Sequence, residues 1–372
     1  MGAGHAHAIV LERWAKSERP DADITVVTNG ETTLYSGMIP GWIAGEYERS
    51  ELELDARLMA RRAGASLVID RVASVDAVER VLILDDGTPV PYDIASLDVG
   101  SQVGSPTGMS GPSHVSARDP GRIIAALSVD PDRSVVVVGG GAAGVELAAC
   151  TRARIRGSVT LVEAGTRLMG SHDGRVSDRV QAALEARSVS VRLGTSASPG
   201  LQDDEPAGRV EGSGAREAHV DGDARGDGEP RSADPLTIWA TGARGPDLLA
   251  ESKLPLDDRG FVRVEDTLQV TGHERLFAAG DCASRDNDPT PKAGFHAIEQ
   301  GEALAGNLAA SVAAWPDRPS ELDGYAPRSD FLTLLNLGDG HALGTKWGLA
   351  AEGRWVRTLK DAIDRRFVRR FQ

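Results

Sequence analysis

The sequence predicts an α/β fold built on doubly wound parallel sheets, and three observations predict it. Val135 to Val138 is a run of four β-branched residues, which is typical of a strand buried on both faces. Three spaced glycines follow, and a helical segment then leads to a second apolar strand at residues 158–163. A shorter echo of the glycine spacing stands at the N-terminus, at Gly2 and Gly4. The chain therefore has two places where a strand, a glycine turn and a helix follow one another.

The central glycines have the spacing of a dinucleotide-binding loop. Gly139, Gly141 and Gly144 fit G-x-G-x-x-G at the turn from strand to helix. The first glycine allows the tight turn, the second lets the backbone approach a pyrophosphate, and the third lets helix and strand pack closely. The N-terminus of the helix then points at the phosphates. We predict a dinucleotide site here; a glycine-rich turn without a ligand is the structural alternative.

Glu163 ends the second strand about twenty residues after the loop, where an acid accepts hydrogen bonds from the adenine ribose. A carboxylate there also repels the 2′-phosphate of NADPH. Ala164 and Gly165 follow it, and the nearest arginine is Arg167. The sequence therefore favours NAD(H) as the cofactor of this site.

Composition and charge restrict the class of protein. The 372 residues are enough for two or three domains, and 41% of them are hydrophobic, as in globular proteins. A net charge of −14 argues against a nucleic-acid partner. Cys150 and Cys282 form no C-x-x-C pair, so we expect no redox-active dithiol and no metal site. Because we find no signal peptide and no apolar run of ~18 residues, we expect a cytoplasmic protein.

Further strands and turns are predicted on both sides of the central loop. After a helical pattern from Ile9 to Trp14, short strands are expected at residues 24–27, 67–69, 81–84 and 94–99, with a hairpin turn at Asp85-Asp86-Gly87. Two later strands end in Ala-Thr-Gly242 and in Gly280-Asp281, and a helix is expected over residues 293–308. Residues 198–234 are rich in charge and glycine, so we expect a flexible surface insertion.

The tail predicts an amphipathic helix with basic polar sides. Its apolar residues recur every four positions: Trp355, Leu359, Ile363, Phe367 and Phe371. Its other sides are basic: Arg354, Arg357, Lys360, Arg365, Arg366, Arg369 and Arg370, opposed by Asp361 and Asp364. Two interpretations stay open. The apolar face binds the inner face of a membrane peripherally, or it packs on the N-terminal domain or across a homodimer.

The order of these motifs resembles the FAD- and NAD(P)H-dependent pyridine nucleotide oxidoreductases from Gly2 to about Leu308. Within that family the chain looks like the type II NADH dehydrogenases. The segment YSGMIPG, from Tyr35 to Gly41, and the ending from Trp355 to Gln372 are similar to the flavoprotein module fused to selenide, water dikinase in some proteins. The lack of a cysteine pair near Tyr35 separates the chain from the disulfide reductases and argues against sulfide:quinone oxidoreductase.

This resemblance implies two Rossmann-like doubly wound nucleotide-binding domains and a short C-terminal α+β domain. Residues 1–110 and 245–312 would form the FAD-binding domain, residues 111–244 the NAD(H)-binding domain, and residues 313–372 the C-terminal domain. The FAD pyrophosphate would lie at Gly2 and Gly4 and the ribityl chain at Asp281 beside Gly280. Gly100 and Gly242 are further expected cofactor-binding glycines.

Three side chains are implied near the reacting rings, where the flavin itself carries the chemistry. Glu146 takes the family position near the nicotinamide, and its alternative role is to place an acid in the first turn of a helix. Tyr35 and Lys292 are candidates for the flavin pocket, and a solvated surface lysine is the alternative for Lys292. The alternative for Asp281 is an ordinary strand-end turn or helix cap.

The sequence departs from the family pattern at three places. No apolar strand precedes Gly2, and His7 takes the place of the third glycine, so we expect either a true start upstream or poor FAD binding. Thr28 and Asn29 stand where an acid is usual, with Glu31 off register. Phe295 and Glu299, beside Gln300, replace the paired glutamines of quinone-reducing members.

The sequence therefore predicts an FAD-dependent NADH:acceptor oxidoreductase. Hydride would pass from NADH to the flavin, and electrons would pass on to a small-molecule or quinone acceptor. The alternative is a nucleotide-binding flavoprotein remnant or partner subunit without turnover, linked to selenium metabolism by resemblance alone.

Overall fold

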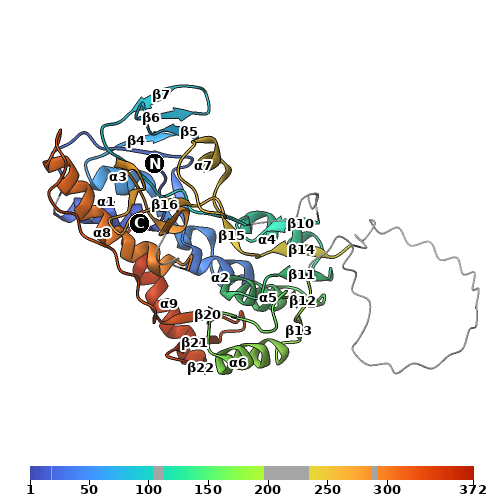
Figure 1. The fold of residues 1–372 in the computed structure, drawn as a ribbon. Helices are drawn as coiled ribbons and strands as arrows, with labels where there is room; N and C mark the ends of the chain where they lie inside the picture. The colour runs from blue at the N-terminus through green and yellow to red at the C-terminus, as the bar shows by residue number, and fades with distance from the viewer. Residues whose placement is uncertain (18, 104–112, 197–233, 286–290) are drawn as a thin grey trace, which may run out of the picture.

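The computed structural model describes residues 1–17, 19–103, 113–196, 234–285 and 291–372. It has the predicted α/β fold. Figure 1 shows two lobes, one holding the N-terminal segment and the orange segments near residue 300, the other holding the green central segment. Each lobe has its own main apolar core, and the C-terminal helix runs between them. The predicted insertion at 198–234 falls, except for Asp234, on residues outside those described.

The central lobe is a five-stranded sheet in which every neighbouring pair is parallel. Its order is β10 (His114–Ser116), β14 (Leu236–Trp239), β11 (Val135–Val138), β12 (Val159–Val162) and β13 (Val189–Arg192). All four valines of β11 are buried, as the β-branched run predicts. Its helices are α4 (Pro120–Val129), α5 (Ala142–Arg154) and α6 (Gly174–Glu185). The glycine loop therefore joins the central strand of this sheet to α5.

The N-terminal lobe is held together by two long helices, α1 (His5–Lys16) and α8 (Gly294–Ala313). They approach closely because Gly301 has no side chain; a Cβ there would lie 2.6 Å from the Ala6 carbonyl oxygen. A second five-stranded sheet lies beside them, in the order β19 (Ala283–Arg285), β16 (Val262–Val264), β17 (Gln269–Val270), β18 (His273–Ala278) and β8 (Ala95–Leu97). A separate parallel pair is formed by β1 (Thr25–Thr28) and β4 (Ser66–Ile69).

Among the described residues, β1 and β8 are linked by backbone hydrogen bonds only through residues 1 and 2. The amide of Gly2 donates to Val27 (2.8 Å), and the amide of Asp98 donates to Met1 (3.0 Å). Beside this bridge lies a cavity of about 620 Å³, lined by side chains of α1, β1 and the β7–β8 segment. The β1–β4 pair and the five-stranded sheet are thus two separate sheets that meet at residues 1 and 2.

Smaller elements surround these sheets. The predicted turn at Gly87, which has φ +84°, joins two strands of an antiparallel sheet: β5 (Val72–Asp76), β6 (Val81–Leu84) and β7 (Pro89–Pro91). Two further strand pairs are β2 (Thr32–Leu34) with β3 (Glu53–Asp55), and β9 (Gln102–Val103) with β15 (Ala243–Arg244). The short helices are η1 (Ser36–Met38), α2 (Ile39–Ala44), η2 (Arg49–Leu52), α3 (Ala56–Arg62), α7 (Asp247–Glu251) and η3 (Gly280–Cys282).

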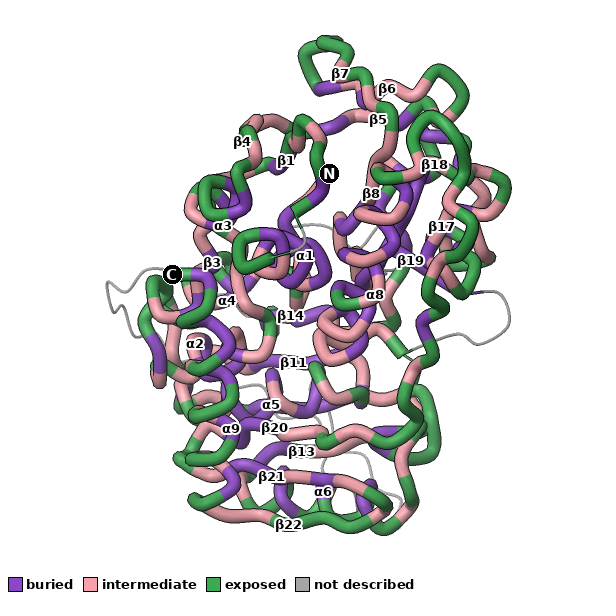
Figure 2. Tube along the Cα trace, turned by 90° about the vertical axis from the view of Figure 1, so that its left-hand side faces the viewer, coloured by how far each residue is buried: buried purple, intermediate pink, exposed green. Residues whose placement is uncertain are grey.

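The C-terminal segment forms an antiparallel sheet and a helix. The sheet consists of β20 (Thr333–Asn336), β21 (Ala342–Lys346) and β22 (Leu349–Gly353), and α9 (Arg354–Val368) runs from it to the N-terminal lobe. Figure 2 shows that α9 has buried positions on its inner side and exposed positions on its outer side. Among the described residues, no helix has the length and apolar character needed to cross a membrane.

The five apolar residues predicted on one face of this helix differ in burial. Trp355, Leu359 and Ile363 are 63%, 40% and 43% exposed. Phe367 and Phe371 are buried, and the other buried positions of the helix include Lys360 and Asp364. The buried face is polar in its middle because it packs on acidic and hydroxyl groups of both lobes, which a helical pattern cannot reveal.

Candidate functional site

The central glycine loop has the geometry that its spacing predicts. A Cβ on Gly144 would lie 1.7 Å from the Gly139 carbonyl oxygen, and one on Gly139, which has φ +116°, would lie 2.4 Å from that of Ala240. Gly141 differs, because a Cβ there would meet no atom within 4 Å. Two glycines thus serve the packing of α5 on β11, and the third leaves the backbone at the N-cap of α5 open to a ligand.

Glu163 lies directly beneath this loop. Its Oε2 accepts a hydrogen bond from the amide of Gly140 (2.5 Å), and its Oε1 accepts one from the amide of Gly165 (2.6 Å). A carboxylate has about four acceptor positions, so lone pairs remain for two hydroxyl groups of a ribose. The acid is therefore held in place at the end of β12, beside the open N-terminus of α5.

The N-terminal loop is tight for a reason that the sequence did not reveal. Asp98, directly after β8, is 4% exposed, and its Oδ2 accepts a hydrogen bond from the amide of His7 (2.9 Å). A Cβ on Gly4 would lie 2.4 Å from this carboxyl group, and one on Gly280 would also lie 2.4 Å from it. Gly2, with φ +86°, passes equally close to the Asp98 backbone. Three predicted glycines therefore surround one buried carboxyl group.

A cavity of about 590 Å³ opens over this loop. It is lined by Gly2, Gly4, His5, Asp98, Gly100, Arg118 and Asp281, among others. Burial lowers the pKa of His5 to about 4, and its Nε2 is buried without a hydrogen-bond partner. Gly100, at φ +69°, and Gly242 would each meet no atom within 4 Å if a Cβ were added, but only Gly100 lines the cavity.

Asp281 lies on the wall of the same cavity and is not a simple turn residue. Its Oδ2 accepts a hydrogen bond from Arg118 (2.8 Å) and another from the Ser101 hydroxyl (3.2 Å). The neighbouring Gly280 donates its amide to Oε1 of the buried Gln300 (2.6 Å). The glycine cradle, the strand-end acid and the unsatisfied imidazole fit a dinucleotide with a hydroxylated chain. The adenine end fits less well, because Glu31 pairs with Arg57 (2.5 Å).

Tyr35 and Glu146 meet at a buried ionic cluster where α9 crosses the two lobes. The Tyr35 hydroxyl donates to Oδ1 of Asp364 (3.2 Å), and Lys360 donates to Oδ2 of Asp364 (2.8 Å) and to the Gly37 carbonyl (2.7 Å). Glu146 accepts from the amide of Asn336 (2.8 Å), and its Oε1 lies 4.0 Å from the Lys360 ammonium. The cluster thus joins one buried cation to two acids.

Burial sets the protonation of this cluster. It raises the pKa of Glu146 to about 7, although the Lys360 charge opposes that rise. Burial lowers the pKa of Lys360, but the charges of Glu146 and Asp364 outweigh it and the pKa is raised overall. Glu146 can therefore gain or lose a proton near neutral pH while Lys360 stays charged, which suits a group that holds a proton beside a reacting ring.

Lys292 is placed differently from Tyr35 and Glu146. Its ammonium donates to the Ala283 carbonyl and lies 4.1 Å from the centroid of the Phe261 ring. Lys292, Tyr35 and Glu146 are all absent from the lining residues of the cavity over the N-terminal loop. Lys292 lies apart from the cluster of Tyr35 and Glu146, with its ammonium bound to a backbone carbonyl.

Four residues of these sites were missed at the level of sequence: Asp98, Arg118, Lys360 and Asp364. The only signal for Asp98 was an acid at the end of an apolar strand, directly before Val99-Gly100. Lys360 and Asp364 could have been noticed as an oppositely charged pair four positions apart. Arg118 carried no signal that we recognise.

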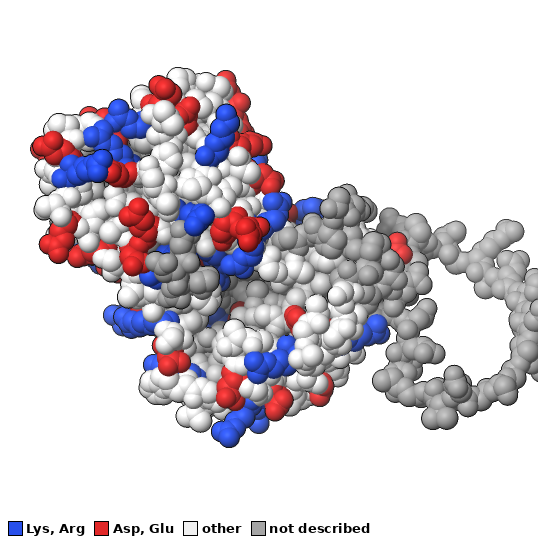
Figure 3. Space-filling model, in the orientation of Figure 1, with Lys and Arg blue, Asp and Glu red and all other residues white. Residues whose placement is uncertain are grey.

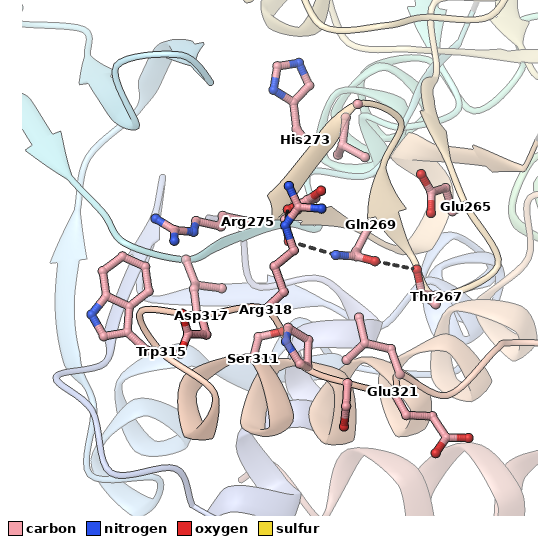
Figure 4. Close-up of a pocket in the computed structure, with 17 residues that line it drawn as sticks. Glu265, Thr267, Gln269, His273, Arg275, Ser311, Trp315, Asp317, Arg318 and Glu321 are labelled. Carbon is pink, nitrogen blue, oxygen red and sulfur yellow. Dashed lines mark hydrogen bonds and ion pairs between the residues drawn. The ribbon is translucent and has the colours of Figure 1, made fainter.

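The outer surface and a further pocket have a different character. Figure 3 shows acidic and basic side chains interspersed over one face of the molecule. The further pocket, of about 370 Å³, lies between β17–β18 and residues 311–322 (Figure 4). Arg318 of this pocket forms an ion pair with Glu274 (2.5 Å), and Arg275 stacks on Trp315. This pocket has no glycine loop and is not the candidate site.

Comparison with known proteins agrees with the two glycine loops. The family profile described as pyridine nucleotide-disulphide oxidoreductase matches residues 1–301. The type II NADH:quinone oxidoreductase of Staphylococcus aureus is 25% identical over 255 residues, which are 64% of this chain and 58% of that protein. The chain thus spans less than two thirds of the length of this relative.

Solved structures share the fold at low identity. The sulfide:quinone oxidoreductase of Aquifex aeolicus has a TM-score of 0.74 at 15% identity and covers 100% of this chain and 90% of its own. NDH2 of Plasmodium falciparum, in complex with NADH, has a TM-score of 0.71 at 12% identity, with 99% and 95% covered. At such identities the likeness establishes the fold alone, and it confirms the predicted fold class.

Proposed function

Because this chain belongs to the pyridine nucleotide-disulphide oxidoreductase family, we propose that it is an FAD-dependent NADH:acceptor oxidoreductase. The observation that carries the proposal is the pair of glycine loops. Each loop has glycines that tolerate no Cβ, and each stands at the N-terminus of a long helix. The central loop also has Glu163, the acid at the end of β12, beside it. This is the arrangement that two dinucleotides need.

NADH would bind at the central loop. The amides around Gly141 would face its pyrophosphate, and Glu163 would accept from its adenine ribose and disfavour a 2′-phosphate. Gly242, after β14, has open space around its α-carbon and is the further glycine proposed for this site. The NADH named for the Plasmodium relative supports this choice of cofactor.

FAD would bind in the cavity of the N-terminal loop. Gly2, Gly4 and Gly280 would let the cofactor approach the backbone, Gly100 would leave room for it, and Asp281 would hold the ribityl hydroxyls. When bound, FAD would supply the hydride acceptor for NADH and the electron donor for the second substrate. We propose residues 1–110 and 245–312 for its domain, 111–244 for the NAD(H) domain and 313–372 for the C-terminal domain.

Glu146, Tyr35 and the partners on α9 would serve the chemistry without forming bonds to substrate. Glu146 would hold a proton at its buried carboxyl group, and Lys360 would fix its position from 4.0 Å away. Tyr35 would support the pocket through His5, a lining residue whose ring lies 5.3 Å from the Tyr35 ring, while its hydroxyl is bound to Asp364. The contribution of Lys292 would be electrostatic, through the wall that carries Asp281.

We propose a quinone or another small molecule as the acceptor, without a dithiol relay. The name of the Staphylococcus relative supports a quinone. Cys150 and Cys282 are both free and buried, and burial raises the pKa of each thiol. Because the thiolate is the reactive form, neither cysteine suits electron relay.

Peripheral contact with a membrane surface is part of the proposal. Trp355, Leu359 and Ile363 form one exposed apolar row on α9, and Arg354 and Arg366 belong to the same helix. A homodimer through the same row is the alternative that the test in the Discussion separates. A link to selenium metabolism is supported only by sequence resemblance, in the segment from Tyr35 to Gly41 and in the C-terminal ending.

The test is NADH oxidation by the FAD-reconstituted chain without oxygen, with a soluble quinone or with no acceptor. We expect turnover with the quinone and no turnover without an acceptor. If NADH reduces the bound FAD but the reduced FAD does not reduce the quinone, the quinone is excluded as the acceptor. The proposed transfer of hydride from NADH to FAD would still stand. A chain that takes up neither cofactor would exclude the proposed function.

The second candidate function is a nucleotide-binding protein without turnover. The position of Asp98 favours it, because the carboxyl group accepts from the His7 amide at the N-terminus of α1, where the FAD pyrophosphate would lie. Such a protein would bind NADH at the intact central loop and would not bind FAD.

A further inference from the structure

Asp98, whose carboxyl group is buried against the N-terminal loop, is among the residues that line the cavity proposed for FAD, and nothing in the cofactor chemistry described above requires an acid there. Asp98 lines that cavity together with Gly2, Gly4 and Asp281. It comes from β8, whereas the loop that it touches leads into α1. Its position is fixed on three sides by the Gly4, Gly280 and His7 backbones.

The carboxyl group occupies part of the N-terminus of α1. The helix has no side-chain cap of its own, since its N-cap residue is Gly4. Oδ2 of Asp98 accepts from the amide of His7, the third residue of the helix, at 2.9 Å. An acid from another strand thus satisfies a helix terminus that would otherwise be available to a phosphate.

Few charges near Asp98 can stabilise its ionised form. Asp281 repels it, while Arg118 is bound to Asp281. The Met1 amino group attracts it when protonated, but burial lowers the pKa of that group to about 6. The rings of His5 and His7, whose pKa values burial lowers to about 4 and about 3, are neutral at pH 7. Cys282 and Gln300 carry no charge there.

A pyrophosphate would add two negative charges to the same low-dielectric cavity. Two anions in such a site raise the free energy of each other's charged form, so the weaker acid takes up a proton. The pyrophosphate is a strong acid and stays ionised, whereas burial already raises the pKa of Asp98 to about 7.

We propose that Asp98 couples FAD binding to proton uptake, because its carboxyl group must be protonated while the pyrophosphate occupies the glycine loop. This inference rests on the proposed FAD site. A protonated Asp98 can still accept from the His7 amide through one oxygen, and its hydroxyl can donate to the anion or to a nearby carbonyl. Binding is therefore strongest at low pH and weakens as the pH rises through the pKa of the free chain.

The test is isothermal titration calorimetry of FAD into the flavin-free chain, in two buffers of different ionisation enthalpy, from about pH 6 to about pH 9. We expect uptake of close to one proton per FAD at about pH 8, and a Kd that rises by about tenfold per pH unit above about pH 7. The wild-type chain alone can overturn the inference: FAD binding without proton uptake contradicts it and leaves the FAD proposal intact.

Two variants assign the proton. Asp98→Asn keeps an acceptor for the His7 amide but removes the acid, so we expect proton uptake to vanish and the Kd to change by less than about twofold between pH 7 and 9. Asp93→Asn removes an exposed carboxylate from the segment before β8 and should behave as wild type. Uptake that persists in Asp98→Asn would point to the neutral Met1 amine or Glu146 and overturn the assignment. Absence of FAD binding at every pH would overturn the proposed function together with this inference.

Discussion

The ammonium of Lys360 lies 4.0 Å from Oε1 of Glu146, although the two residues belong to different helices and are far apart in sequence. α9 supplies the lysine, and α5, which begins at the central glycine loop, supplies the glutamate. A single buried cation therefore links the C-terminal helix to the helix that would bind NADH. Removal of this cation should affect both stability and protonation.

Lys360→Met should lower the free energy of unfolding by about 3–5 kcal/mol. The variant leaves Asp364, which is 4% exposed, buried without its ion-pair partner, and only the Tyr35 hydroxyl remains on it. Urea unfolding monitored by circular dichroism measures the change. Lys16→Met is the matched control, because the Lys16 side chain is 69% exposed, and it should shift stability by less than about 0.5 kcal/mol. Equal effects of the two variants would contradict the account of the cluster.

The central loop should respond differently to alanine at its second and third glycines. Gly144→Ala places a Cβ 1.7 Å from the Gly139 carbonyl and should destabilise the chain by more than about 3 kcal/mol. Gly141→Ala meets no atom within 4 Å, so the fold should be unchanged, but the Cβ would stand where the backbone meets a pyrophosphate. We expect NADH affinity to fall by about tenfold or more in Gly141→Ala. Melting temperatures and NADH titration separate the two effects, and unchanged affinity in Gly141→Ala would remove NADH from this loop.

Glu163→Ala should weaken NADH binding by about tenfold and reduce the preference for NADH over NADPH. The variant removes the ribose acceptor, the repulsion of a 2′-phosphate and the acceptor of the Gly140 amide. Titration with both nucleotides gives the ratio of the two Kd values. Glu185→Ala, an exposed glutamate on α6 that pairs with Gln181, is the control. A ratio that stays at the wild-type value in Glu163→Ala would show that the acid does not select the cofactor.

The exposed row on α9 predicts binding to anionic vesicles. A triple variant with glutamine at Trp355, Leu359 and Ile363 should lose most of the co-sedimentation that the wild-type chain shows. The control replaces three exposed apolar residues elsewhere by glutamine: Val78, Val129 and Leu332. If both triple variants bind vesicles as the wild type does, the row is not a membrane contact. If the wild-type chain is a dimer, and the dimer is lost in the α9 variant but not in the control, the row is a homodimer contact instead.

The sequence pattern predicts the parts of the molecule in which local and tertiary preferences agree. The valines of β11, the loop glycines and Glu163 form one continuous motif whose spacing determines its geometry. The hairpin turn at Gly87 is also local, and the structure contains it. Asp98 and its neighbours could not be predicted in this way, because Gly4, Gly280 and Asp98 approach one another only after the lobe has folded.

The helix α9 shows the limit of pattern reasoning most directly. Its apolar residues at intervals of four predict one apolar face, but of these five residues only Phe367 and Phe371 are buried. The middle of the helix is instead buried through Lys360 and Asp364, because Tyr35 and Glu146 supply partners from other elements. An amphipathic pattern records which residues are apolar, but it does not record where buried counter-charges are available.

The absorption spectrum of the FAD-reconstituted chain, before and after addition of NADH without oxygen, tests the central claim most directly. The account predicts a bound-flavin spectrum that NADH bleaches, with a slower response to NADPH because of Glu163. The Gly141→Ala variant should keep the flavin spectrum and bleach only at higher NADH. A chain that stays colourless after incubation with FAD, or a bound flavin that NADH cannot reduce, would contradict the account.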